Sequence, residues 1–189
     1  MGSALVIFES MFGNTQVIAQ AVADGLARHL PVDLVEVGAA PAAVGPDVEL
    51  LVVGGPTHAF GMSRLSTRQP AAEQADTGLV STRIGLREWL GRLANGSAEV
   101  AVAAFDTRVS KPRLPGSAAA AAEKRLRRLG FRVAARSRSF YVDGTPGPLL
   151  AGEADRARHW GEELGAMAWA AHTPATSPRG WAAGLRQRS

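Results

Sequence analysis

The sequence of 189 residues contains no cysteine, and this absence excludes several kinds of chemistry. Without a thiol there is no disulfide, no thiolate metal site, no cysteine nucleophile and no thiol redox centre. Any redox activity would therefore depend on a bound cofactor. Long apolar runs are also lacking: the first covers only residues 4–8, and no basic segment precedes it. We expect a cytoplasmic protein that does not contact a membrane.

Aromatic residues are few, and they are not interleaved with the basic ones. Residues 64–138 carry fifteen bases and six acids, whereas residues 51–63 carry no charge. A basic stretch can attract acidic partners or nucleic acid, but binding of single strands needs aromatic side chains among the cations. We therefore expect no nucleic acid as a partner. The four histidines lack the spacing and the carboxylate neighbours of metal ligands, so we expect no metal site.

The sequence does contain a regular alternation of apolar runs and amphipathic segments. The runs predict strands at residues 4–8, 32–37, 50–53, 100–105 and within 131–142. The amphipathic segments predict helices from Asn14 or Thr15 to Leu26, and over residues 81–93, 117–129 and 153–171. This alternation favours an open, doubly wound α/β sheet. We expect one domain over residues 1–171, and a mobile tail over 172–189 that buries little.

The loop after the first strand, Ser-Met-Phe-Gly-Asn-Thr at residues 10–15, contains no lysine or arginine. In a doubly wound sheet, ligands bind beyond the carboxyl ends of the strands. The N–H groups at a helix N-terminus suit an anion, Ser10 and Thr15 add hydroxyls, and Gly13 allows close backbone approach. The glycine patterns of a P-loop and of a dinucleotide fingerprint are absent. The loop thus predicts a phosphate site, although a tight turn with a helix cap would also account for it.

Two more ligand-type segments follow the third and fourth predicted strands. They read GGPTHAFGMSR from residue 54 and FDTRVSKPR from residue 105. The first offers small and aromatic residues able to line a planar ring. Its His58 has no carboxylate partner in the pattern, which favours a hydrogen-bonding or stacking role over proton donation.

The stretch VIFESMFGNTQVIAQAVADGL, residues 6–26, resembles the FMN-phosphate signature of the flavodoxin family. GGPTHAFG resembles that family's second, ring-flanking loop, in the style of the quinone-reductase branch, and FDTR stands where the third loop falls. The resemblance covers about residues 3–171. It implies a flavodoxin-like open doubly wound sheet of five parallel strands in the order 2-1-3-4-5, with helices on both faces. The implied cofactor is FMN.

The resemblance also implies which residues hold FMN. The phosphate would be surrounded by Ser10, Met11, Phe12, Gly13, Asn14 and Thr15. The isoalloxazine would be flanked by Pro56, Thr57, His58, Ala59, Phe60 and Gly61. Its other side would be closed by Asp106, Thr107 and Arg108, among which there is no aromatic residue. No catalytic side chain is implied, since the flavin itself transfers the electrons.

Three functions are compatible with this pattern. The first is an electron carrier between larger redox proteins, here with acidic docking faces because the chain is basic. The second is an NAD(P)H-dependent FMN reductase acting on a quinone or similar small acceptor. In that case residues 62–85 would form a lid, and Arg64, Arg68 and Arg108 would meet phosphates of the dinucleotide. The third is a non-redox module that binds a phosphate-bearing ligand.

Overall fold

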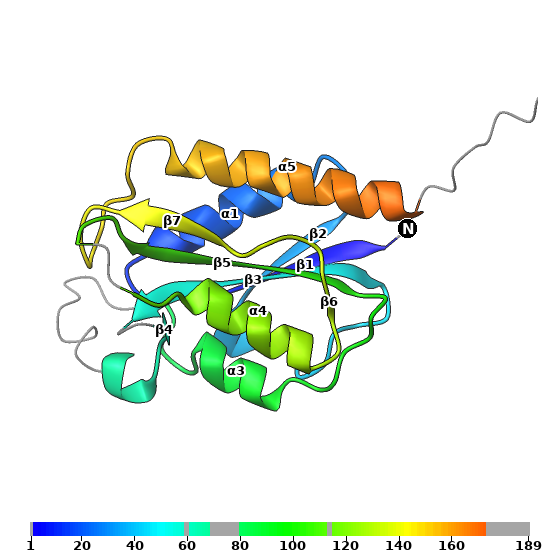
Figure 1. Cartoon of the computed structure of the whole chain (residues 1–189), viewed down its shortest axis with the longest axis horizontal. Helices are drawn as coiled ribbons and strands as arrows, with labels where there is room; N and C mark the ends of the chain where they lie inside the picture. The colour runs from blue at the N-terminus through cyan, green and yellow to red at the C-terminus, as the bar shows by residue number, and fades with distance from the viewer. Residues whose placement is uncertain (1, 59–60, 69–79, 113–114, 173–189) are drawn as a thin grey trace, which may run out of the picture.

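The chain forms a twisted sheet covered by helices on both faces (Figure 1), described by a computed structural model over residues 2–58, 61–68, 80–112 and 115–172. The strands are β1 (Ser3–Phe8), β2 (Val32–Glu36), β3 (Val48–His58), β4 (Gly61–Met62), β5 (Ala101–Val109), β6 (Arg132–Val133) and β7 (Arg138–Val142). The helices are α1 (Asn14–Leu26), the 3-10 turn η1 (Val37–Ala39), α3 (Leu86–Arg92), α4 (Ala118–Arg128) and α5 (Glu153–His172). The predicted tail, residues 172–189, lies outside this range except for His172, which is the last residue of α5.

The strand order confirms the predicted doubly wound sheet. The sheet runs β2-β1-β3-β5, and both β6 and β7 pair in parallel with β5. Residues 134–137 separate these two short strands, so the predicted fifth strand is present in two parts. Counted as one strand, they give the order 2-1-3-4-5. The remaining strand, β4, pairs antiparallel with the end of β3.

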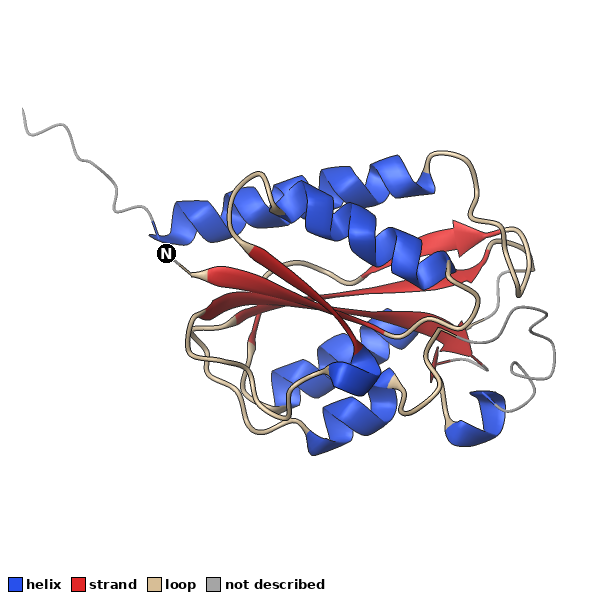
Figure 2. Cartoon of the chain, turned by 180° about the vertical axis from the view of Figure 1, so that it is seen from behind, coloured by secondary structure: helices blue, strands red, loops and turns tan. Residues whose placement is uncertain are grey.

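Each face of the sheet has its own helix pair and its own apolar core. Helices α1 and α5 lie on one face and α3 and α4 on the other, an arrangement also visible from behind (Figure 2). Under α5, the rings of Phe105, Phe140 and Trp160 pack edge-on or tilted, with centroids 6.1–6.2 Å apart. A Cβ on Gly25 of α1 would lie 2.1 Å from the Arg158 carbonyl oxygen. Glycine is therefore what lets these two helices touch backbone to backbone.

The sequence predicts an apolar stripe of Ala157, Trp160, Leu164, Met167 and Ala171 on the last helix, but Met167 and Ala171 lie outside the core. Met167 is 46% exposed, whereas Ala157, Trp160, Leu164 and Ala168 are buried. The buried positions follow the 3.6-residue period of a helix, and Ala168 occupies the place that the prediction gave to Met167.

The two strands that lead to the ligand-type segments are longer than predicted. β3 continues past Val53 to His58, and β5 continues past Phe105 to Val109. Their extensions pair with each other, up to Pro56 opposite Thr107. β1 ends opposite Gly54 and β4 joins β3 only from Thr57, so Pro56 pairs with β5 alone and its missing N–H is tolerated. The predicted second and third loops are therefore largely strand ends.

Helix α3 begins at Leu86 and not at the predicted Ser81. The backbone N–H of Ser81 donates to the Ser10 carbonyl oxygen at 2.8 Å, and its hydroxyl accepts from the Ser10 N–H at 3.0 Å. Residues held in this way to the first loop cannot enter a helix. The helix starts instead after Gly85, whose N–H donates to the Glu88 side chain at 2.9 Å.

Candidate functional site

The loop between β1 and α1 presents an uncapped helix N-terminus. The N-cap is Gly13, with a φ of 87° in the left-handed region, and no cap side chain bonds the helix. The prediction that Asn14 or Thr15 caps this helix is therefore wrong. The Ser10 hydroxyl accepts from the N–H groups of Gly13 at 3.1 Å and Gln16 at 3.3 Å.

Other donors of this loop remain for a ligand. Among the described residues, no acceptor is present for the backbone N–H groups of Met11, Phe12, Asn14 and Thr15. The Asn14 and Thr15 side chains make contacts across the site: Asn14 donates to the Pro146 carbonyl oxygen at 2.9 Å, and Thr15 shares a 2.7 Å hydrogen bond with Thr107. The loop is thus anchored to β5 and to the turn after β7, while its amides keep the capacity to bind an anion.

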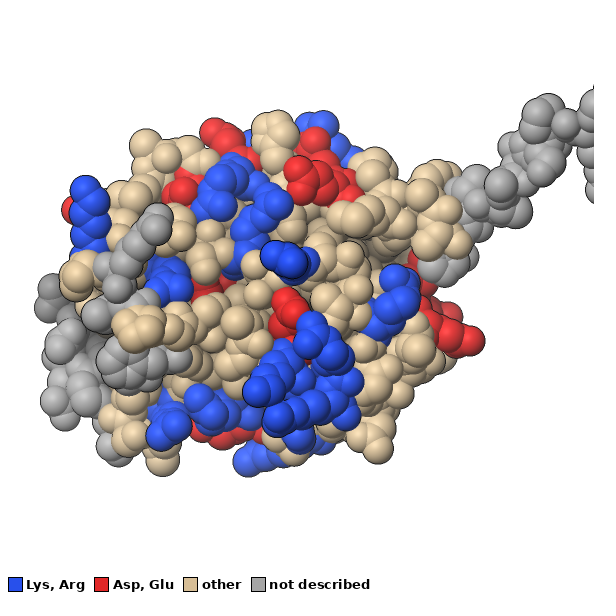
Figure 3. Space-filling view, in the orientation of Figure 1, with Lys and Arg blue, Asp and Glu red and all other residues tan. Residues whose placement is uncertain are grey.

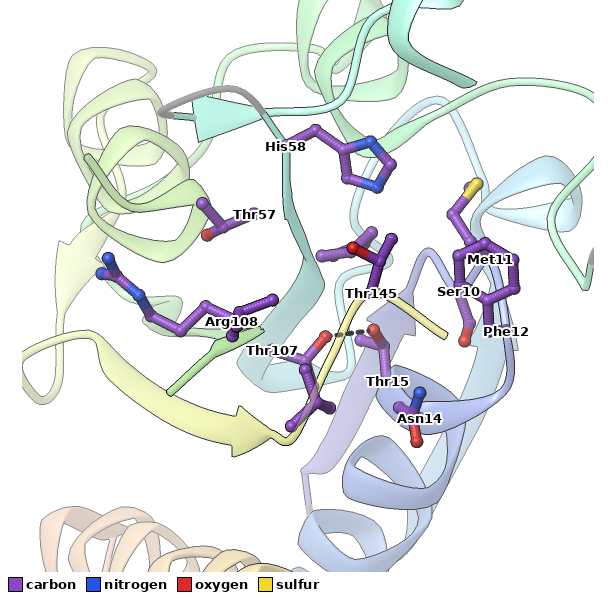
Figure 4. A pocket seen from close by; sticks show the side chains of 13 residues that line it. Ser10, Met11, Phe12, Asn14, Thr15, Thr57, His58, Thr107, Arg108 and Thr145 are labelled. Atoms are coloured by element: carbon purple, nitrogen blue, oxygen red, sulfur yellow. Dashed lines mark hydrogen bonds between the residues drawn. The ribbon is translucent and has the colours of Figure 1, made fainter. Parts of the chain in front are cut away.

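A cavity of about 260 Å³ lies against this loop at the carboxyl ends of β1, β3 and β5 (Figure 4). It is lined by Ser10, Met11, Phe12, Asn14, Thr15, Pro56, Thr57, His58, Thr107, Arg108, Val109, Val142 and Thr145. None of these described residues is acidic. We call it the main pocket.

The structure brings most of the predicted site residues to this pocket, with some exceptions. Gly13 and Asp106 do not line it, and Gly61 lines a neighbouring cavity. Ala59 and Phe60 lie outside the described residues.

Three lining residues were not predicted from the sequence: Val109, Val142 and Thr145. The turn signal Asp-Gly-Thr-Pro-Gly after the fifth strand, residues 143–147, could have indicated Thr145.

Asp106 lies beneath the pocket and has a structural role. Its side chain is fully buried, and Oδ2 accepts from the Thr57 hydroxyl at 2.9 Å, the Ser117 hydroxyl and the Ala119 N–H at 3.0 Å. It therefore joins β5, the end of β3 and the N-terminus of α4. Its second oxygen, Oδ1, is buried without a hydrogen-bond partner among the described residues.

A second cavity, of about 280 Å³, shares His58 with the main pocket. Its lining consists of His58, Gly61, Met62, Arg64, Ser66, Thr67 and Arg87. Burial lowers the pKa of His58, and the charge of Arg68 lowers it further, while a hydrogen bond to the Thr67 backbone acts in the opposite direction. The imidazole is therefore neutral at neutral pH and serves as a hydrogen-bonding group. We call this space the arginine cavity.

A buried polar network supports the walls of the arginine cavity. The carboxylate of Glu9, which is 1% exposed, accepts from the Ser63 hydroxyl and from the Leu86 N–H at 2.7 Å. Arg68, 7% exposed, donates to the Ser63 hydroxyl and to Glu88, each at 3.0 Å. This Glu9 network ties the end of β1 to the 61–68 segment and to the start of α3. Sequence reasoning missed it, because nothing in the pattern distinguishes Glu9 from a surface residue.

The Glu9 network makes stability depend on pH. Burial raises the pKa of Glu9 above its ordinary value of 4.5, although bonds from Ser63 and Leu86 and the charge of Arg68 lower it. The resulting stability is present below the unfolded pKa and is lost as the pH rises through the raised folded pKa. Glu9→Gln removes this titration. The difference in unfolding free energy, wild type minus variant, should fall as the pH rises above 4.5, by at most about 1.4 kcal/mol per pH unit.

Urea unfolding at pH values from 4.5 to 8 measures this difference. The exposed Glu99 provides the matched control, since Glu99→Gln should give a difference that does not change with pH in this way. Parallel curves for Glu9→Gln and wild type would show that Glu9 ionises like an exposed carboxyl.

Comparison with known proteins shows to which family the chain belongs. The family model described as flavodoxin matches residues 6–169. The chain belongs to the flavodoxin family. Comparison with curated protein sequences gave no match. Family membership implies FMN as the cofactor, and the backbone N–H groups of Met11, Phe12, Asn14 and Thr15 fit the phosphate of that group.

Solved flavodoxin structures share the fold at low sequence identity. Flavodoxin 1 from Bacillus cereus is 15% identical with a TM-score of 0.62, covering 92% of this chain and 100% of that one. The Streptococcus pneumoniae TIGR4 flavodoxin is 18% identical with a TM-score of 0.59, covering 87% and 99%. A flavodoxin described as a WrbA-like protein, from Agrobacterium tumefaciens, is 15% identical with a TM-score of 0.54, covering 89% and 98%. These likenesses concern the fold.

Two further findings concern the described residues only. No group of three or more His, Asp or Glu side chains there is arranged to hold a metal ion. None of the helices in the described ranges has both the length and the apolar character needed to cross a bilayer.

Proposed function

We propose that this member of the flavodoxin family binds FMN in the main pocket and carries electrons between larger redox proteins. The observation that carries the proposal is the N-terminus of α1, whose N-cap residue offers no side chain and whose amides border a pocket with no acidic side chain among its described lining residues. Such amides bind a phosphate without a cationic side chain. FMN, when bound, supplies the electron-transfer chemistry itself.

The residues of the chain bind and orient the cofactor. In this proposal the loop at residues 10–15 holds the phosphate. The strand end at residues 56–58 lines one side of the ring site, and Thr107 with Arg108 lines the other. Arg108 donates to the Gly116 carbonyl oxygen at 2.9 Å, which holds its charge at the pocket. A fixed cation there would favour reduction, since it stabilises negative charge added to the ring.

The charge around the site supports a partner with an acidic docking face. Arg108 lines the main pocket, Arg64 and Arg87 line the arginine cavity, and none of the described residues that line either space is acidic. Complementary charge speeds association and orients the partner. A second group of cations, the exposed Lys124, Arg127 and Arg128, lies over the carboxyl-terminal part of α4 (Figure 3). This group is remote from the pocket, because α4 begins beside Asp106 and runs away from it.

The arginine cavity favours a second candidate function, an NAD(P)H-dependent FMN reductase acting on a small acceptor such as a quinone. Of the three arginines expected to meet phosphates, Arg68 is buried in the Glu9 network, while Arg64 and Arg108 line cavities. A cationic space beside the flavin pocket suits a charged co-substrate.

An absorption spectrum of the purified protein tests the premise shared by both functions. We expect the spectrum of bound flavin, or its appearance after FMN is added. A colourless protein that takes up no FMN would contradict both functions and support a non-redox module for another phosphate-bearing ligand. Anaerobic mixing of the FMN-loaded protein with NADPH separates the two redox functions. Persistent flavin absorbance supports the carrier, and prompt bleaching supports the reductase.

A further inference from the structure

The arginine cavity holds two cationic side chains from two different elements. Arg64 follows β4, and Arg87 lies in the first turn of α3. In the described ranges neither forms an ion pair with an acidic residue, and no described residue of the lining carries a carboxylate. Two cations at one cavity repel each other unless an anion binds between them.

Arg87 is held in place before any ligand arrives. Its Nε donates to the Ser63 carbonyl oxygen at 3.1 Å, and one Nη donates to the Met62 carbonyl oxygen at 2.9 Å. The side chain is half-buried, so its guanidinium loses little further freedom when it binds a ligand. The geometry is that of a preorganised anion-binding group.

The Glu9 network fixes the two walls relative to each other. Ser63, which lies between the lining residues Met62 and Arg64, is bonded to Glu9. Leu86, the neighbour of Arg87, is bonded to the same carboxylate. Burying Glu9 and Arg68 is costly, and a satisfied buried network rigidifies the structure around it. Glu9 is thus a positioning residue for the arginine cavity.

We propose that the arginine cavity binds the phosphoryl group of a small-molecule co-substrate whose remaining part reaches the main pocket past His58. A guanidinium presents a planar fork of N–H groups that matches phosphate oxygens, and Ser66 adds a hydroxyl. His58 lines both spaces and connects them. The redox role of this co-substrate rests on the proposed FMN function, whereas the phosphate site itself does not.

Calorimetric titration of the FMN-loaded protein with inorganic pyrophosphate, at constant ionic strength, tests this site. FMN keeps the probe away from the phosphate loop. Binding to wild type is expected, and Arg64→Ala and Arg87→Gln should each weaken it by about tenfold or more, the effect of losing a charge-assisted contact. Arg64→Lys should restore part of the affinity because it keeps the charge.

Arg92→Ala is the matched control, since Arg92 is exposed on the same helix outside the cavity. It should change pyrophosphate affinity less than about twofold, as expected for a screened surface charge. Absence of binding to wild type, or equal weakening by Arg92→Ala and Arg64→Ala, would overturn the proposal. Arg64 is itself exposed, so its replacement leaves folding intact.

Two sources of the phosphoryl group are distinguished by competition with NADP⁺. Displacement of pyrophosphate would assign the site to a nicotinamide dinucleotide. Binding that NADP⁺ does not displace would assign it to a smaller phosphorylated molecule, and either result supports a phosphate site. Flavin absorbance, measured in parallel, reports on FMN binding separately. If the FMN-loaded protein does not bind pyrophosphate, this inference is overturned and the proposed function still stands.

Discussion

Ser10→Asp should reduce FMN affinity by at least about a hundredfold, or about 2.7 kcal/mol. The Ser10 hydroxyl already accepts from the Gly13 and Gln16 N–H groups. A carboxylate there would satisfy the N-terminus of α1 and favour the helix by about 0.3–1 kcal/mol. It would also place a negative charge near the bound phosphate. At about 5 Å and an effective dielectric constant of about 20, two unit charges repel by roughly 3 kcal/mol.

Fluorescence titration with FMN and with riboflavin measures this effect. Riboflavin lacks the phosphate, so its affinity should change far less, and the wild-type preference for FMN should disappear. Gln16→Glu is the control, because this exposed residue adds the same charge in the first turn of α1 but does not line the main pocket. If Ser10→Asp weakened both ligands equally, the phosphate would have to bind elsewhere.

Asp106→Ala should lower the free energy of unfolding by about 3–5 kcal/mol, because it leaves one buried and two half-buried donors without their acceptor. These donors are the hydroxyls of Thr57 and Ser117 and the N–H of Ala119. For a chain of this length the loss corresponds to a fall in Tm of roughly 10 °C. FMN affinity should fall as well, because Thr57 lines the main pocket and loses its partner.

Thermal and urea unfolding of the FMN-free protein measure the stability loss without a contribution from ligand binding. Asp47→Ala is the matched control: Asp47 is exposed, and its removal should change stability by no more than about 0.5 kcal/mol. Asp106→Asn keeps one acceptor oxygen and should lie between wild type and Asp106→Ala. A stable Asp106→Ala protein with impaired FMN binding would mean that Asp106 serves the flavin directly, as the family resemblance implied.

The sequence by itself determined the fold class and the first loop, and its resemblance to the flavodoxin family implied the strand order. Apolar runs alternating with amphipathic segments depend on local periodicity, and the motif of residues 10–15 is contiguous, so both can be recognised along the chain. Parallel strands end together at one edge of the sheet. This rule predicted that residues 10–15, 56–58 and 107–108 would approach one another there.

Only the tertiary structure decided the length of the strand ends, the place of Asp106 beneath the pocket and the partners of Glu9. Pro56 is tolerated in β3 because β1 ends before it, and Ser81 is kept out of α3 because it bonds to Ser10. The Glu9 carboxylate meets Ser63 and Leu86, which are 54 and 77 residues away in sequence. Burial and pairing of this kind depend on contacts between distant segments, and local patterns of residue type carry no information about them.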